Sequence, residues 1–315
     1  MYCWRLLRDA GYEVECFYGT EARRTWQQLR RVYQEIGHEA VQHRAYLDVN
    51  RRGALERRWR VPYLSQFQVG EMIALALPYA LARRCGYVAL GLERSSDVPG
   101  LMYRGRPVNH QHQKSSSFIS ALNRYLAVRF SGAVRVVSPI HGLYDLGVYA
   151  RLLRTAPSLV RLQSSCGGSN GQRAHCGRCE KCAFLAGLLA GLSGNRGLYR
   201  RLFPNDPLSV PALYGEWLSW TPSRPLTCAG LKDELRLALC LAKARGWRSA
   251  MTDPWCYAPS ARAAHRRLAY LLAAHESGLI PSSMARRLAP PMSVDFGELH
   301  ELLDTYLATS TPSSS

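Results

Sequence analysis

The chain has 315 residues, and 47% of them are hydrophobic, which is enough to build a buried core. A formal net charge of +18 would suit a nucleic-acid-binding protein, but almost all of the excess is scattered arginine without a nucleic-acid-binding motif, so we discount that class. No run reaches the roughly 18 apolar residues of a membrane span, and the first residues lack the layout of a signal peptide. We therefore expect a cytoplasmic protein with no membrane association, in which part of the charge binds a small polyanion such as a nucleotide.

Strands alternate with helices in the first 200 residues. The expected helices are 2–10, 23–36, 66–85, 117–130, one that ends near 153 and a buried one at 183–192; the expected strands are 12–18, 43–49, 87–92 and 134–138. This order predicts a parallel α/β sheet, in which ligands bind at the carboxyl ends of the strands.

The region 201–308 is predicted to be mainly helical. Helices are expected at 231–245, 260–276 and 295–308, and Asp295 with Glu298 fits a capping box for the last one. The polar end of the chain, 309–315, is expected to be a disordered tail. We thus predict an α/β domain over 1–200 and a helical region over 201–308.

Four clustered cysteines form the strongest local signal: Cys166, Cys176, Cys179 and Cys182. Two C-x-x-C steps that share Cys179, with one thiol upstream, can place four sulfurs around one ion. We expect a structural zinc site, because four thiolates leave no position open for water. An iron–sulfur cluster is the alternative, and we favour zinc because no other redox motif accompanies the cysteines.

Polar residues follow the predicted strands in a characteristic succession. The motifs are Gly91–Asp97, Val108–Ser115, Ser138–Leu146, Lys181–Phe184 after the cysteines, and 225–239. Taken together, and in this order, they resemble the muramoyl-dipeptide glutamate epimerase family, a branch of the ATP-pyrophosphatase (PP-loop) superfamily. The resemblance covers about residues 4–245, and the cysteine cluster is also similar to the zinc site of PP-loop enzymes that make a deazaguanine.

The resemblance implies a PP-loop type of parallel sheet and an ATP- and Mg²⁺-dependent reaction. In this family the α-carboxylate of the terminal L-glutamate in UDP-N-acetylmuramoyl-L-alanyl-L-glutamate would be activated as an acyl-adenylate. Loss of the carboxylate charge makes the α-proton acidic enough to be removed, and its return to the opposite face gives D-glutamate for peptidoglycan precursors.

Candidate roles follow from side-chain chemistry at the motif positions. Glu93 could hold Mg²⁺ or act as a base, and His110 and His141 could transfer protons. The candidates for binding phosphate, carboxylate or substrate hydroxyl groups are Arg94, Arg104, Arg106, Lys114, Ser95, Asn109 and Ser115.

One expected motif is absent from the sequence. PP-loop enzymes carry a glycine-rich loop whose backbone amides cradle pyrophosphate, and this loop would precede the helix at 2–10. Either the true start lies upstream or the chain is a shortened paralogue; the intact downstream motifs favour the first explanation.

Two other functions remain open. The chain could be a PP-loop enzyme that adenylates a different carboxylate in specialised peptide or deazapurine biosynthesis. It could instead be a non-catalytic, zinc-stapled protein that binds nucleotides or nucleic acid, in which case its affinity for nucleic acid would depend steeply on salt.

Overall fold

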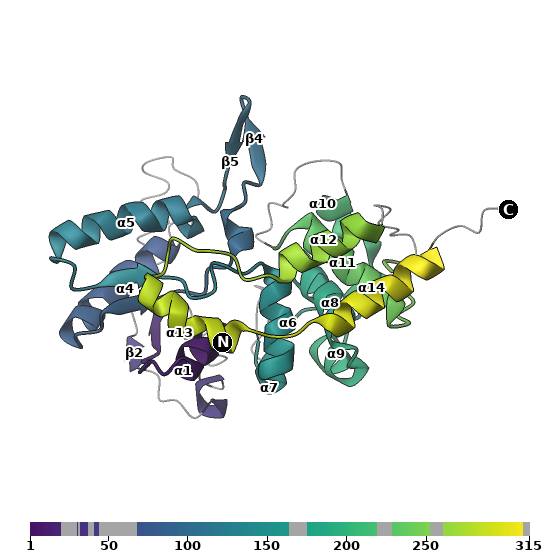
Figure 1. The fold of residues 1–315 in the computed structure, drawn as a ribbon, viewed down its shortest axis with the longest axis horizontal. Helices are drawn as coiled ribbons and strands as arrows, with labels where there is room; N and C mark the ends of the chain where they lie inside the picture. The colour runs from purple at the N-terminus through teal and green to yellow at the C-terminus, as the bar shows by residue number, and fades with distance from the viewer. Residues whose placement is uncertain are drawn as a thin grey trace.

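The structure is a computed structural model of the chain. It describes residues 1–19, 30, 32–36, 41–43, 68–163, 175–218, 229–252 and 261–310. Within these ranges the protein is a mixed α/β structure in which helices predominate (Figure 1).

Parallel pairing of strands is confirmed, although each pair is small. β1 (Phe17–Gly19) pairs with β2 (Val41–His43), and β3 (Tyr87–Ala89) pairs with β6 (Arg135–Val137); both pairs are parallel. In the described residues these are separate two-stranded sheets, so a continuous PP-loop type of sheet stays a prediction. The strand expected at 12–18 is confined to its last residues, and 44–49 lies outside the described ranges.

The strand expected at 87–92 was predicted to be buried, and this is wrong. Tyr87 is 38% exposed, and Ala89 is exposed too. The neighbouring strand β6 carries the buried positions instead, because Val136 and Val137 are fully buried. Val136 packs with α4 (Gln68–Ala82) and α5 (Ser116–Arg129) in a small hydrophobic cluster.

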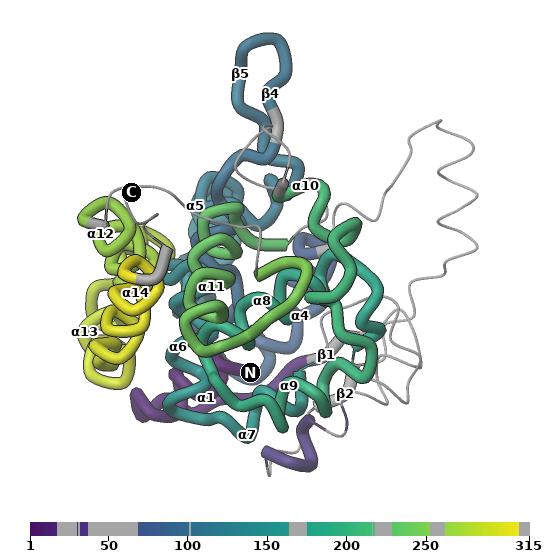
Figure 2. Tube along the Cα trace, turned by 90° about the vertical axis from the view of Figure 1, so that its right-hand side faces the viewer, coloured from purple at the N-terminus to yellow at the C-terminus, as the bar shows by residue number. Residues whose placement is uncertain are grey.

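The loop expected at 93–114 contains a β-hairpin that the sequence did not predict. β4 (Leu101–Tyr103) and β5 (Arg106–Val108) are antiparallel, and they project from the body of the molecule in both views (Figures 1 and 2). The turn of this hairpin contains Arg104 and Gly105, both with positive φ. Met102 and Tyr103 of the hairpin are each 62% exposed.

Most of the core lies among the helices. They are α1 (Tyr2–Asp9), α6 (Asp145–Thr155), α7 (Pro157–Val160), α8 (Glu180–Ser193), α9 (Arg196–Leu202), α10 (Gly215–Leu218), α11 (Lys232–Ala244), α12 (Ala261–Leu272), α13 (Ser282–Met292) and α14 (Gly297–Ser310). The prediction of a buried helix at 183–192 is confirmed: α8 is buried from Cys182 to Leu192.

The central contact of this core joins α8 to α11. Gly191 permits it, because a Cβ at that position would lie 2.2 Å from the backbone oxygen of Ala238 on α11. α8 also begins at Glu180, three residues before the predicted start. The helical character expected after residue 200 is confirmed for the described residues.

The end of the chain differs in three respects from the prediction. α13 was not predicted, and it lies against α1 at the N-terminus (Figure 1). The predicted capping box is wrong: Asp295 accepts from the Gly297 amide at 2.9 Å and not from that of Glu298, and the Glu298 carboxylate binds Arg245 at 2.6 Å and Arg154 at 2.9 Å. α14 continues through the first two residues of the expected tail, and 311–315 lies outside the described ranges.

Candidate functional site

The carboxyl ends of β3 and β6 meet at one edge, and a serine joins them. The Ser138 hydroxyl donates to the Leu92 carbonyl at 2.7 Å and accepts from the Leu92 amide at 3.2 Å. Both residues are buried. Because paired parallel strands end at the same edge, this bond brings the polar residues after Leu92 close to those after Ser138.

A 3-10 turn, η2 (Arg94–Asp97), follows β3 at this edge. Glu93 precedes it, is half-buried, and accepts the Ser96 hydroxyl at its backbone carbonyl (2.7 Å). The Arg94 amide donates to Leu143 at 2.7 Å, which joins the two loops. The Arg94 guanidinium donates to the Glu276 carbonyl at 3.3 Å and lies 5.9 Å from the centre of the Tyr144 ring.

The predicted binding residues of the next loop surround a second 3-10 turn, η3 (His112–Lys114). Asn109 donates to the Ser96 carbonyl at 2.9 Å and so fixes this loop on η2. His110 and Lys114 are half-buried on the same loop. The Ser115 hydroxyl caps α5 by accepting from Phe118 at 3.2 Å. Arg104 and Arg106 are exposed on the projecting hairpin, so the structure does not bring them to this edge.

A buried carboxylate, Glu234 at the start of α11, is hydrogen-bonded to several elements of the site. It accepts the Leu231 amide at 2.7 Å, the Leu146 amide at 2.9 Å and the Ser95 hydroxyl at 3.0 Å. Ser95, itself buried, also accepts the Asp145 amide at 3.1 Å. Burial raises the pKa of Glu234 to about 7, against the lowering effect of its hydrogen bonds. Glu234 therefore ties η2 to the N-termini of α6 and α11.

His141 lies in the loop after β6 and contacts polar groups on both sides of its ring. Its Nε2 is 3.4 Å from Asp97 Oδ2, and its Nδ1 is 3.2 Å from the Ser277 hydroxyl. Burial alone would raise the pKa of Asp97, but hydrogen bonds from His141 and Ser116 lower it to about 2. Asp97 is consequently ionised at neutral pH, beside a buried imidazole.

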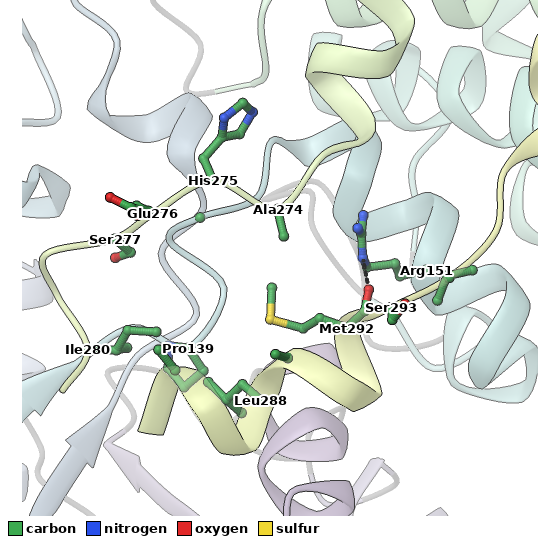
Figure 3. Close-up of a pocket in the computed structure, with 14 residues that line it drawn as sticks. Pro139, Arg151, Ala274, His275, Glu276, Ser277, Ile280, Leu288, Met292 and Ser293 are labelled. Atoms are coloured by element: carbon green, nitrogen blue, oxygen red, sulfur yellow. Dashed lines mark hydrogen bonds between the residues drawn. The ribbon is translucent and has the colours of Figure 1, made fainter. Parts of the chain in front are cut away.

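A cavity of about 510 Å³ opens beside Ser277 (Figure 3). It lies between α6, α13 and the segment 274–280, and Pro139 and Gly142 of the loop after β6 also line it. Ser277 is at one end of the cavity and Arg151 at the other in Figure 3. The volume is in the range of small-molecule sites.

The cysteine cluster lies at the start of α8. The sulfurs of Cys176, Cys179 and Cys182 lie within 4.8 Å of one another, and those of Cys176 and Cys182 are 3.8 Å apart. Two sulfurs bound tetrahedrally to one zinc, with bonds of about 2.3 Å, are separated by about 3.8 Å. The three thiols therefore fit a zinc ion; Cys166, the predicted fourth ligand, lies outside the described residues.

Comparison with known proteins finds two similar sequences, which carry the same name. The chain is 27% identical over 224 residues to the UDP-N-acetyl-alpha-D-muramoyl-L-alanyl-L-glutamate epimerase of a Micromonospora strain, covering 69% of this chain and 46% of the relative. It is 28% identical over 211 residues to the protein of the same name from Salinispora tropica, covering 64% of this chain and 44% of the relative. The chain thus spans less than half the length of either relative, and the predicted resemblance to this family is confirmed over about two thirds of the chain.

Other comparisons add no further relative. No family model matches the chain, and no solved structure matches it. Among the described residues, none of the helices combines the length and the apolar character needed to cross a membrane.

Three residues of this site were not assigned roles from the sequence. Asp97 stands inside the first polar motif, and its position four residues after Glu93 was the available signal. Glu234 stands inside the last motif, where its place in the first turn of a helix suggested only a cap. Ser277 had no local signal, because it is 136 residues from His141 in sequence.

Proposed function

We propose that this chain acts in the ATP- and Mg²⁺-dependent epimerisation of the terminal L-glutamate of UDP-N-acetylmuramoyl-L-alanyl-L-glutamate. The observation that carries the proposal is the similarity, over 69% of the chain, to a protein named for this reaction. The nucleotide-linked substrate places the reaction in the cytoplasm, as a step in peptidoglycan precursor synthesis.

The arrangement of the polar loops supports this proposal. Glu93 and Arg94 follow β3 and His141 follows β6, so that groups for metal binding, anion binding and proton transfer come from one edge. ATP with Mg²⁺ would supply the activated α-carboxyl group. In our proposal Glu93 holds Mg²⁺ or acts as a base, and His110 and His141 transfer protons.

Binding of the anionic substrate is assigned to the remaining polar groups. Arg94 and Lys114 pair with phosphate or carboxylate oxygens, and Asn109 supplies hydrogen bonds. Ser95 and Ser115 have the same proposed role, and their hydroxyl groups also hold the Asp145 amide and the start of α5, respectively. They therefore contribute by fixing the shape of the loops as well.

The zinc site has a structural role in this proposal. Zinc held by Cys176, Cys179, Cys182 and Cys166 would anchor the start of α8, the most buried helix of the core. No water position is left on a metal bound by four thiolates, so the ion takes no part in the chemistry.

The test uses two forms of the protein, because the printed sequence contains no glycine-rich phosphate loop. One form is this chain; the other is extended upstream in the same reading frame. Each is incubated with ATP, Mg²⁺ and the UDP-muramoyl dipeptide, and AMP and D-glutamate are measured. Formation of both products by either form supports the proposal. Glu93→Gln should abolish formation of the products, whereas Glu301→Gln, on the exposed face of α14, should leave it unchanged.

Two results would count against the proposal. If both forms are folded and zinc-loaded but make neither product, the epimerase function is refuted. If AMP forms with a different carboxylic acid and not with the muramoyl dipeptide, the chain is an adenylating enzyme of another pathway.

A further inference from the structure

The three side chains Asp97, His141 and Ser277 form a continuous polar chain. They come from η2, from the loop after β6 and from the segment after α12, which are far apart in sequence. The distances are 3.4 Å from Asp97 Oδ2 to His141 Nε2 and 3.2 Å from His141 Nδ1 to Ser277 Oγ. His141 is only 4% exposed, so its ring is shielded from solvent.

Each end of this chain is fixed by backbone contacts. Asp97 Oδ1 accepts the Ser116 amide at the start of α5 at 2.9 Å. The Ser277 hydroxyl accepts the Leu279 amide at 3.2 Å. These bonds set the direction of both side chains independently of His141.

The segment that carries Ser277 is also locked onto the loop of His141. The His275 amide donates to the Gly142 carbonyl at 2.8 Å. A Cβ at Gly142 would lie 2.3 Å from the His275 carbonyl oxygen, so only glycine permits this approach. Arg94 holds the same segment by its bond to Glu276.

The cavity beside Ser277 has chemically different ends. Arg151 lines the end opposite Ser277 and is 4% exposed (Figure 3). Its guanidinium binds three carbonyl oxygens, those of Met292, Gly147 and Leu272, and the described residues give it no ion pair with a carboxylate. Between the two ends the α13 side of the cavity is apolar, with Leu288 and Ala289. A cation, an apolar wall and a polar hydroxyl suit an aliphatic acid.

We infer that Ser277, His141 and Asp97 form the proton-transfer chain that removes the glutamyl α-proton, and that the glutamyl group is bound in the cavity beside Ser277. The inference rests on the proposed epimerisation. Ser277 is the group that contacts substrate, and Asp97 is a positioning residue that acts through His141.

The proton transfer balances within these groups. The Cα–H bond breaks, and its electron pair passes to the activated carbonyl group to give an enolate. The proton goes to Ser277 Oγ while the hydroxyl proton of Ser277 moves to His141 Nδ1. The imidazolium formed at His141 faces the Asp97 carboxylate, which stabilises it. Protonation of the enolate on its opposite face is a separate step.

The experiment measures exchange of the substrate α-proton in D₂O, using the form of the protein that is active in the epimerase assay. We expect Ser277→Ala to lower the rate of exchange by about 100-fold or more, the usual contribution of a general acid–base group, with KM little changed. Ser277→Thr, which keeps the hydroxyl group, should recover part of the rate. Ser283→Ala, an exposed serine of α13 that does not line the cavity, is the matched control and should exchange as the wild type does.

A second measurement needs no substrate. The carboxyl resonance of Asp97 is followed against pH by NMR in the wild type and in His141→Gln. His141 is one of the groups that lower the pKa of Asp97, so loss of the imidazole should raise this pKa from about 2.

The outcomes separate the two proposals. Wild-type exchange in Ser277→Ala overturns the inference while the epimerase function stands. If the wild-type protein is inactive, the proposed function fails, and the NMR measurement then decides the inference. An unchanged pKa of Asp97 in His141→Gln overturns the proton-transfer chain as well. A raised pKa supports the chain, with a different acid as its substrate.

Discussion

The carboxyl group of Glu234 is fully buried where three elements meet, and replacing it should change how stability depends on pH. Its two oxygens accept hydrogen bonds from the Leu231 amide, the Leu146 amide and the Ser95 hydroxyl. Burial raises its pKa from an ordinary 4.5 to about 7. The perturbation we consider is Glu234→Gln, which keeps the shape and removes the titration.

The sign and size of the effect follow from proton linkage. Between pH 4.5 and 7 the folded protein keeps the proton on Glu234, whereas the unfolded chain has lost it. The folded state therefore binds more protons in this range, and its stability falls as pH rises. At roughly 1.4 kcal/mol per pH unit, the difference is about 3 kcal/mol. In the glutamine variant one oxygen becomes an amide nitrogen facing an amide donor, which costs about 1–3 kcal/mol at every pH.

The assay is urea unfolding of both proteins at several pH values from 4.5 to 8. The wild type should be more stable than Glu234→Gln at low pH, and this advantage should shrink by about 3 kcal/mol by pH 8. Other titrating groups are common to both proteins and cancel in the difference. Asp233→Asn, which removes a neighbouring half-exposed carboxylate, should keep the wild-type dependence. A difference between wild type and Glu234→Gln that is constant over the whole range would refute the reasoning.

Three further predictions concern the cysteine cluster, a histidine pair and the main helix contact. Cys179→Ser should lower the zinc content per chain measured by elemental analysis, whereas Cys240→Ser, a buried thiol outside the cluster, should retain it. The Nδ1 atoms of His265 and His300 are 3.0 Å apart. Burial, and after it the neighbouring His265, lowers the pKa of His300 below its ordinary value of 6.5. The stability linked to this group is therefore fully present above pH 6.5 and is lost as pH falls through the pKa of His300 in the folded protein. Thermal unfolding between pH 7 and 5 should show a smaller loss in His300→Gln than in the wild type, and an equal loss would contradict the prediction. Gly191→Ala should destabilise the protein by about 1–3 kcal/mol in urea unfolding, because the new methyl group would lie 2.2 Å from the backbone of α11. This cost should exceed the roughly 1 kcal/mol gained in helix propensity. An unchanged unfolding midpoint would show that α8 and α11 separate freely.

Local patterns were sufficient for several helices and for the cysteine cluster. The apolar periodicity of α4, α5, α8 and α11 predicted each of them within a few residues, because an amphipathic or fully buried helix leaves its signature in sequence. The C-x-x-C spacing predicted that Cys176, Cys179 and Cys182 would lie together, because the chain between them is too short to separate their sulfurs.

Predictions that depended on wider context were less successful. The run at 87–92 is apolar, yet only its first three residues form β3, and part of that strand is exposed. Apolar runs of this length do not show which neighbour will cover them. α13 was missed because Pro290 and Pro291 near its end masked a helix that lies against α1. The division into domains at residue 200 stays a prediction.

The sequence by itself determined the family resemblance, the order of the main helices and of the parallel strands, and many of the residues from which a site could be built. Only the tertiary structure decided that Ser277 lies against His141, that Glu234 joins two helix N-termini, and that Arg151 shares a cavity with Ser277. The physical reason is that spacing along the chain controls contacts within a few residues, whereas contacts over 80 to 140 residues arise from burial of the helices that carry them.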